Sequence, residues 1–467
     1  MNKIVKRTIK DVIAVAFVLF AIYLSYCVVE WKDTSGDYYS SVKQLYATDD
    51  NRIDVVFMGS SHCYCGINPA ILWEDEGIAA FDMSISGQDS ANAIMALKEL
   101  LKTQSPKVVY VDMYALYSER GGVEGNIYRN TLPWKFSKDS VKYLSDYIGK
   151  EERMDYITRF PIVHTRYREL GKNDFVAYEP NRYARGEGMN FNCTPVSFGD
   201  MDLTTETEEL SDFNKAWLDE LRKLSEENGF ELELIVIPTI LSHEERVINN
   251  SAKAYADKNG MKFTDYCDLF DEIGLDEDVD FVDYYHLSAF GAAKFTSYLE
   301  KNSLTEYSLP DHRGDQNYTQ WDKDLERYKR LESQNRMENL SGYELADYIA
   351  GRNGYTTIIN YEPNETADAE YFFEIVSPLG VEKTSFTEGG TWIIDDNGAT
   401  KVGTNTEGEE PYYLDLNRYD TLKISYYGFV DAKNIMVGRE EIRTAGYCMS
   451  VVIYDEVLRE VVVNTAY

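Results

Sequence analysis

Residues 53–62, IDVVFMGSSH, form the stretch that decides the fold. The first six are mostly apolar and are closed by Gly59, which is typical of a short buried strand that ends in a tight turn. Ser60 and Ser61 follow, and serine often begins a helix. A buried strand that leads directly into a helix predicts the first unit of a parallel α/β sheet.

The same alternation continues along the chain. Further strands are predicted at 79–85, 107–113, 231–238 and 261–266, and helices at 90–101, 213–227, 245–258 and 288–302. Residues 51–305 are therefore expected to form a flavodoxin-like, doubly wound α/β domain with a parallel sheet. Residues 115–210 interrupt the alternation and are rich in Tyr, Arg, Asn and Gly. We interpret them as an insertion, a candidate lid or acceptor-binding surface.

The N-terminus carries a candidate membrane anchor. Residues 12–29 are free of charge and just long enough to cross a bilayer. The basic residues before this stretch are Lys3, Lys6, Arg7 and Lys10, whereas Glu30 and Asp33 flank the single Lys32 after it. Because basic flanks stay in the cytoplasm, residues 1–31 are predicted to be a cytoplasmic tip and one transmembrane helix, with the rest of the chain outside. A cleaved signal peptide is the alternative, but no clear small-x-small cleavage site follows.

Three segments complete the predicted organisation. Residues 32–50 are polar and are expected to form a short stalk. Residues 306–340 are highly charged, with apolar positions at helical spacing, and are expected to form a linking helix. Residues 341–467 are expected to form a separate β-rich domain with one helix near 342–350. Its β-type runs are 356–360, 371–376, 391–395, 422–428, 450–455 and 460–464.

Composition excludes several classes of function. The net charge is −33, from 47 Lys and Arg against 80 Asp and Glu. This charge argues against nucleic acid as a partner, because binding it needs clustered cations. The six cysteines include no CxxC pair, and Cys63 and Cys65 lack a second pair of ligands at zinc spacing. We therefore expect these cysteines to pack in the core, and no metal or organic cofactor is predicted.

Chemistry is expected where the parallel strands end. The first strand delivers Ser61, the second delivers Gly87, and the loop before the last helix delivers Asp283 and His286. A serine hydroxyl needs a base to become a nucleophile, and that base needs a third group to orient it. We predict Ser61 as nucleophile, His286 as base and Asp283 as the orienting carboxylate. The backbone N–H groups of Ser61 and Gly87 are the predicted oxyanion donors.

Each residue also has a simpler interpretation. Ser61 could only cap a helix, and His286 could be an ordinary surface histidine. His62 is expected to point away from Ser61, with packing or substrate contact favoured over catalysis. His243 could be a rival base or a metal ligand, although its SHEE context is more typical of a helix start. The presence of Ser61, Gly87, Asp283 and His286 in the right order favours the catalytic interpretation.

With these motifs in place, the chain resembles the SGNH/GDSL hydrolase superfamily over residues 51–305. Gly59-Ser60-Ser61 matches the family's nucleophile turn, Gly87 matches its oxyanion glycine, and Asp283-Tyr284-Tyr285-His286 matches its Asp-x-x-His block. The family's Gly-x-Asn-Asp block has no counterpart here. One side-chain oxyanion donor is therefore missing, and the candidate substitutes are Gln88, Asn92 and Tyr114.

Similar departures occur in the membrane-anchored branch that resembles DltD and the alginate O-acetylation proteins. The resemblance implies an extracytoplasmic O-acyl esterase or O-acyltransferase that acts on a cell-surface polysaccharide or teichoic-acid-like polymer, beside a membrane-bound O-acyltransferase. The alternative is a non-catalytic adaptor that binds glycan and docks on such an acyltransferase. The C-terminal part, from LKISYYGFVDAKN to the run that begins at Gly446, resembles the interleukin-like EMT inducer domain. That resemblance implies a compact β-rich fold and glycan binding.

Overall fold

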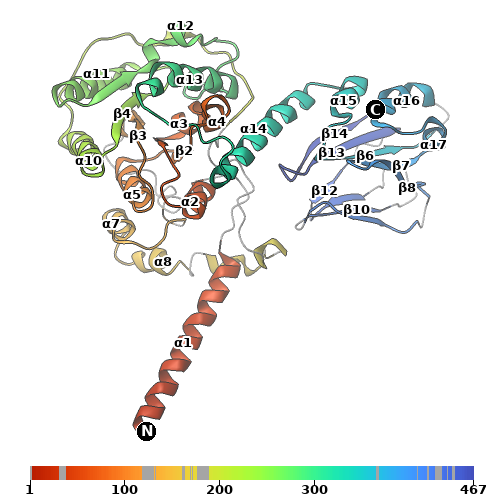
Figure 1. The fold of residues 1–467 in the computed structure, drawn as a ribbon, viewed down its shortest axis with the longest axis horizontal. Coiled ribbons are helices and arrows are strands. Elements are labelled where there is room, and N and C mark those ends of the chain that lie inside the picture. The colour runs from red at the N-terminus through yellow and green to blue at the C-terminus, as the bar shows by residue number, and fades with distance from the viewer. Residues whose placement is uncertain are drawn as a thin grey trace. The chain divides into compact units, whose positions relative to one another are not determined.

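The computed structural model describes most of the chain (Figure 1). The described residues are 3–30, 38–117, 131, 133–159, 163–168, 170, 172–175, 189–363, 368–406, 409–417, 420–425, 434–438, 440–443 and 448–467. They fall into two compact units, Met1–Leu325 and Glu326–Tyr467.

A five-stranded parallel sheet forms the centre of the first unit. Its strands are β1 (Val55–Met58), β2 (Ala80–Asp82), β3 (Val108–Asp112), β4 (Glu231–Val236) and β5 (Lys262–Asp265). They lie in the order β2-β1-β3-β4-β5, and all neighbours are parallel. This is the flavodoxin-like order, so the predicted fold class is confirmed. Every residue of β1 and β3 is buried, which explains their continuous apolar runs.

Helices cover this sheet. One group is α3 (Ser61–Gly66), α4 (Pro69–Glu76) and α13 (Ala289–Asn302), in which α13 packs against the other two. Another consists of α5 (Ser90–Leu100) and α10 (Asp212–Asn228), which pack against each other, while α11 (His243–Lys258) packs against β5. A helix directly after the first strand was expected, and α3 is that helix, whereas α4 was not among the predicted elements. Asn68 caps α4 with its side chain and Pro69 begins it, so a local start signal was present in the sequence.

The predicted insertion, 115–210, contains little regular structure where it is described. Its helices are α7 (Lys138–Tyr147) and α8 (Arg153–Thr158), with 3₁₀ turns at His164–Arg168, Lys172–Phe175 and Phe198–Asp200. A part of the candidate lid lies outside the described residues, including 118–130 and 176–188.

Two helices precede the sheet. Helix α1 (Lys3–Val29) contains a stretch, Thr8–Val29, with a mean hydropathy of 2.7, long and apolar enough to cross a membrane. Helix α2 (Tyr38–Ala47) lies in the segment expected to be a stalk. Its Val42 and Leu45 are fully buried and belong to the main hydrophobic core of the first unit. These residues are therefore part of the folded unit.

The second unit contains two antiparallel sheets. The larger has the order β14-β13-β6-β7-β8, and the smaller has the order β12-β11-β10-β9. Their strands are β6 (Tyr355–Tyr361), β7 (Gly390–Asp395), β8 (Gly398–Gly403), β9 (Tyr412–Asp415), β10 (Thr421–Ser425), β11 (Asn434–Val437), β12 (Glu440–Ile442), β13 (Met449–Asp455) and β14 (Glu460–Ala466). Ile358, Ile393 and Val452 of the larger sheet share an apolar cluster with residues of the smaller one. The opposite face of the larger sheet packs against helices, which confirms a β-rich C-terminal region.

The helices of this unit correct one sequence prediction. They are α15 (Gly342–Ile349), α16 (Ala369–Val376) and α17 (Lys383–Thr387), and α14 (Thr319–Glu338) begins in the first unit and ends in the second. The run 371–376 was expected to be a strand but is helical in α16. Asp368 caps this helix by accepting the backbone N–H of Glu370 and Tyr371. Its buried side chains, Phe372, Ile375 and Val376, lie on one helical face, so the cap and the helical period outweigh β propensity.

Candidate active site

The turn after β1 presents Ser61 at the carboxyl edge of the sheet. Ser60 caps α3 by accepting the backbone N–H of His62 at 3.2 Å, which leaves Ser61 as the first residue of the helix. Gly59 must be glycine here, because a Cβ at this position would lie 2.6 Å from Cβ of Asp112 and 2.9 Å from Cβ of Cys63. The strand, the close approach and the cap together fix a half-buried serine hydroxyl above β1.

The three predicted catalytic side chains lie in one hydrogen-bonded row. Ser61 Oγ is 2.8 Å from Nε2 of His286. The other ring nitrogen, Nδ1, lies 2.9 Å and 3.0 Å from the two carboxylate oxygens of Asp283. A carboxylate only accepts, so this network assigns the proton to Nδ1 and leaves Nε2 free to accept the serine proton.

The loop of residues 281–287, here the Asp-His loop, holds this geometry. Val282 N–H donates to the His286 carbonyl at 2.9 Å, and Phe281 and Leu287 form an isolated bridge. Asp283 Oδ1 also accepts the backbone N–H groups of Tyr285 and His286, at 2.8 Å and 3.0 Å. The carboxylate is thus fixed by its own loop before it orients the imidazole.

The charge state of Asp283 follows from these contacts. Partial burial on its own would raise the pKa of this carboxyl. The hydrogen bonds from His286 and from the two backbone N–H groups outweigh burial, and the pKa is lowered from its ordinary value. Asp283 is therefore an anion beside Nδ1 at neutral pH.

A second segment, residues 189–206, supports the Asp-His loop from outside. Thr194 N–H donates to the Phe281 carbonyl at 2.8 Å, and the Tyr284 hydroxyl donates to Asp200 at 2.9 Å. Ile240, in the loop between β4 and α11, donates its N–H to the Tyr284 carbonyl at 3.0 Å. These contacts were not predictable from the sequence pattern, because each joins residues that are far apart along the chain.

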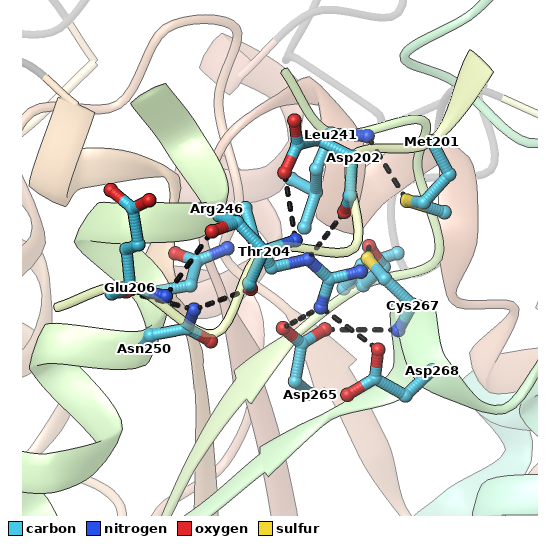
Figure 2. Close-up of polar contacts among 12 residues, drawn as sticks. Met201, Asp202, Thr204, Glu206, Leu241, Arg246, Asn250, Asp265, Cys267 and Asp268 are labelled. Carbon is cyan, nitrogen blue, oxygen red and sulfur yellow. Dashed lines mark hydrogen bonds and ion pairs between the residues drawn. The ribbon is translucent and has the colours of Figure 1, made fainter. Parts of the chain in front are cut away.

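Figure 2 shows how this supporting segment is anchored. Arg246 is buried, and its Nε donates to the Asp202 carbonyl at 3.0 Å. Its Nη1 pairs with Asp265 and Asp268, each at 2.9 Å. Asp202 N–H also donates to the Leu241 carbonyl at 3.1 Å. A buried cation with two anionic partners and a backbone carbonyl ties the segment to α11 and to the end of β5.

The predicted oxyanion groups lie around the same turn. Ile85 N–H donates to the Gly59 carbonyl at 3.0 Å, so the turn that carries Gly87 runs beside the nucleophile turn. Gly87 has a φ of 62°, a conformation that glycine adopts without strain. The candidate substitutes Gln88 and Asn92 are both buried, and Gln88 Nε2 donates to Asn92 Oδ1 and to the Met83 carbonyl. Tyr114, the third candidate for the missing oxyanion donor, is half-buried. Its ring contacts the ring of His62, which lies next to the triad.

His62 lies beside the triad. Its ring centre is 5.5 Å from that of His286 and 4.8 Å from that of Tyr114, edge-on in both cases. Burial, together with the nearby His286, lowers the pKa of His62 to about 3. Its ring is therefore neutral near pH 7 and only weakly basic, so it is a poorer proton acceptor than an ordinary histidine.

Two buried carboxyls lie beneath the site, and the sequence interpretation gave them no role. Asp112 ends β3 and accepts backbone N–H groups from Ser60, Tyr114 and Ile237, which join the ends of three strands. Asp82 ends β2 and accepts the Ser84 N–H at 2.7 Å. Burial raises the pKa of each to about 7. The sequence did contain a signal for these two carboxyls, since in each strand an aspartate directly follows a run of apolar residues.

The remaining histidines do not join the triad. His243 is exposed on α11 and pairs with Asp202 at 3.2 Å. His312 pairs with Asp54 at 2.7 Å and stacks on Tyr318. Within the ranges given above, no group of three His, Cys, Asp or Glu side chains could hold a metal ion.

The fold and the site together define a class: a doubly wound α/β protein with a Ser-His-Asp triad at the carboxyl edge of its sheet. No family model matches the chain, and no curated protein matches it. Among solved structures, it is similar to a putative acylhydrolase from Bacteroides fragilis, with 14% identity, 59% of this chain and 98% of that one covered, and a TM-score of 0.29. It is also similar to a GDSL-like lipase from Bacteroides thetaiotaomicron, with 13% identity, 58% and 98% covered, and a TM-score of 0.27. TM-scores this low support no argument about function, so the chemistry of this chain is inferred from its own triad alone.

Proposed function

We propose that this chain is an extracytoplasmic, serine-dependent O-acyl esterase or O-acyltransferase that acts on a cell-surface polysaccharide or teichoic-acid-like polymer. The row of hydrogen bonds from Ser61 through His286 to Asp283 carries this proposal. A nucleophile, a base and an orienting anion in direct contact form the arrangement that acyl transfer requires.

In the proposed first step, His286 Nε2 takes the proton of Ser61 Oγ while that oxygen attacks the ester carbonyl carbon. The N–H groups of Ser61 and Gly87 stabilise the tetrahedral oxyanion. Collapse breaks the bond to the alcohol, which leaves with the proton from His286, and Ser61 keeps the acyl group. Water or a glycan hydroxyl then attacks this acyl-serine through the same steps, and His286 returns the proton to Ser61.

The proposed location rests on α1. Its uncharged run, residues 12–29, follows Lys3, Lys6, Arg7 and Lys10, and basic residues favour the cytoplasmic side. The first unit then works outside the cell on polymer at the membrane surface. A membrane-bound O-acyltransferase is the proposed partner that supplies acyl groups, and the second unit is the proposed glycan-binding module.

Labelling with a fluorophosphonate probe tests the enzyme proposal. The full chain in detergent should be labelled, and Ser61→Ala should abolish labelling. Ser105→Ala, an exposed serine in the loop before β3, is the matched control and should label like the unmodified protein. Absence of labelling in the folded chain would contradict the proposal.

That outcome would favour the second candidate, a non-catalytic adaptor that binds glycan. One observation favours the adaptor: the Gly-x-Asn-Asp block is absent from the sequence, and the amide donors of Gln88 are already used inside the protein. The adaptor would bind polymer equally well with Ser61→Ala.

A further inference from the structure

Within the described part of the chain, the imidazole ring of His62 has no hydrogen-bond partner. The residue is 5% exposed, and its backbone N–H donates to Ser60 Oγ, whereas no hydrogen bond of its ring nitrogens is found among the described residues. Removing an imidazole from water without a new hydrogen bond is unfavourable, whereas a phenyl ring of similar size could fill the same space without that cost. Packing alone therefore does not explain a histidine here.

The ring nitrogens of His62 are nevertheless accessible. A ring nitrogen that was fully enclosed and had no partner would count as a buried unsatisfied atom, and neither nitrogen of His62 does. Because the ring has no partner among the described residues, part of the small exposed area of His62 belongs to its nitrogens. Because His62 follows the nucleophile directly and its ring lies edge-on to His286, this small opening is in the region of the triad.

The neighbouring rings hold His62 in a fixed orientation. Tyr114 contacts it edge-on from the end of β3, and Tyr285 of the Asp-His loop lies parallel to it, with ring centres 6.4 Å apart. Tyr285 is 52% exposed, so the wall that begins at His62 continues to the outside of the protein. A fixed imidazole loses little conformational entropy when it binds a ligand.

The position of the ring indicates which part of a substrate it meets. The strand order places Gly87, after β2, on one side of Ser61, and Tyr114, after β3, on the other. His62 contacts Tyr114 and His286, so it lies on the side away from Gly87. The alcohol of an ester must lie close to His286, which gives that alcohol its proton. His62 is therefore next to the alcohol part of the substrate.

We infer that His62 is a specificity-determining residue that binds a second hydroxyl group of a polyhydroxylated alcohol, such as a sugar, next to the oxygen that His286 protonates. This inference rests on the proposed function of the triad. A neutral imidazole has one donor and one acceptor, and a hydroxyl group has both as well, so the two are matched. An alcohol with no further hydroxyl leaves the His62 nitrogens unpaired. Because burial lowers the pKa of His62, the ring stays neutral near pH 7 and keeps one donor and one acceptor for the hydroxyl group.

The test compares two unactivated acetates with the full chain in detergent. One is a mono-O-acetylated methyl glucoside, and the other is cyclohexyl acetate, whose alcohol has a similar ring but no second hydroxyl. The readout is the ratio of their kcat/KM values. His62→Phe keeps a ring of similar volume without nitrogens, and it should lower this ratio by about tenfold, the effect of one lost hydrogen bond. His62→Gln restores one donor and one acceptor and should recover part of the ratio.

His243→Phe is the matched control, since this histidine is exposed on α11 and does not contact the triad. Its ratio should equal that of the unmodified protein. Fluorophosphonate labelling of each variant reports a folded triad independently of the alcohol. An unchanged ratio in both labelled His62 variants would overturn the inference while leaving the proposed function intact. Absence of labelling in the unmodified chain would overturn both.

Discussion

Asp283 determines which ring nitrogen of His286 carries the proton. Its carboxylate faces Nδ1 of His286 at 2.9 Å, and this contact fixes which ring nitrogen carries the proton. An asparagine in its place can donate to Nδ1 and stabilise the wrong tautomer. Asp283→Asn should therefore lower kcat by about 10⁴-fold with little change in folding.

Steady-state ester hydrolysis and a thermal unfolding curve measure the two effects. Asp278→Asn, an exposed acidic residue five positions earlier, is the control and should behave like the unmodified protein. A variant at 283 that keeps more than about a tenth of the activity would contradict the assigned role of this carboxylate.

Gly59 shows a steric requirement of the nucleophile turn. A methyl group there would lie 2.6 Å from Cβ of Asp112, so strand β3 or the turn must move. Gly59→Ala should reduce the free energy of unfolding by about 1–3 kcal/mol, and fluorophosphonate labelling should also be weakened. Gly149→Ala has no atom within 4 Å of the added methyl group and is the matched control. Equal denaturation midpoints for the two variants would contradict the crowding at position 59.

At the scale of elements, the buried ends of β2 and β3 make stability depend on pH. Burial raises the pKa of Asp82 to about 7, far above that of an aspartate in an unfolded chain. Between pH 4 and 7 the folded state then binds more protons than the unfolded state, so stability falls as pH rises through this window. The unfolding temperature should be higher at pH 5 than at pH 8.

Asp82→Asn tests the source of this dependence. Oδ1 accepts the Ser84 N–H, and the buried Oδ2 has no hydrogen-bond partner among the described residues, so a neutral amide retains the existing hydrogen bond. The variant should unfold several degrees higher at pH 8 and should lose part of its pH dependence. Asp50→Asn, an exposed residue before β1, should leave the curve unchanged. An identical pH curve for Asp82→Asn would show that the carboxyl is ionised in the folded state.

The elements also show what sequence can predict. The five parallel strands were predicted from short apolar segments that alternate with helices, and the signal was strongest for β1 and β3, which are buried along their whole length. Ser61, Asp283 and His286 were predicted because function lies where such strands end. Asp200 and Arg246 were not predicted as supports of the Asp-His loop, since their partners lie far away in the sequence. The run 371–376 was assigned to the wrong type of element, because its aromatic residues fit a strand while Asp368 begins a helix.

At the scale of the whole molecule, α2 decides where the first unit begins. Val42 and Leu45 are buried in the main core, although residues 32–50 read as a polar stalk. A chain that starts at residue 38 should fold and react with the fluorophosphonate probe. A chain that starts at residue 51 loses the buried apolar side chains of Val42 and Leu45 and should be less stable by roughly 3–6 kcal/mol.

Urea denaturation of the two truncated chains measures this difference. Equal midpoints would show that α2 contributes nothing to the unit. Removal of α1 in both chains should also release the protein from membranes, and continued sedimentation of the shorter chains with membrane vesicles would contradict the role of α1 as an anchor.

Because α2 already belongs to the folded part of the first unit, the linker between it and α1 is short, which limits how far this part can lie from the end of α1. Only residues 30–37 separate the end of α1 from the start of α2. Eight residues span at most about 29 Å when fully extended. Under the proposed function, a triad held to the bilayer by so short a linker would act on polymer that is still close to the lipid, such as newly emerging chains, rather than on the mature outer layers of an envelope.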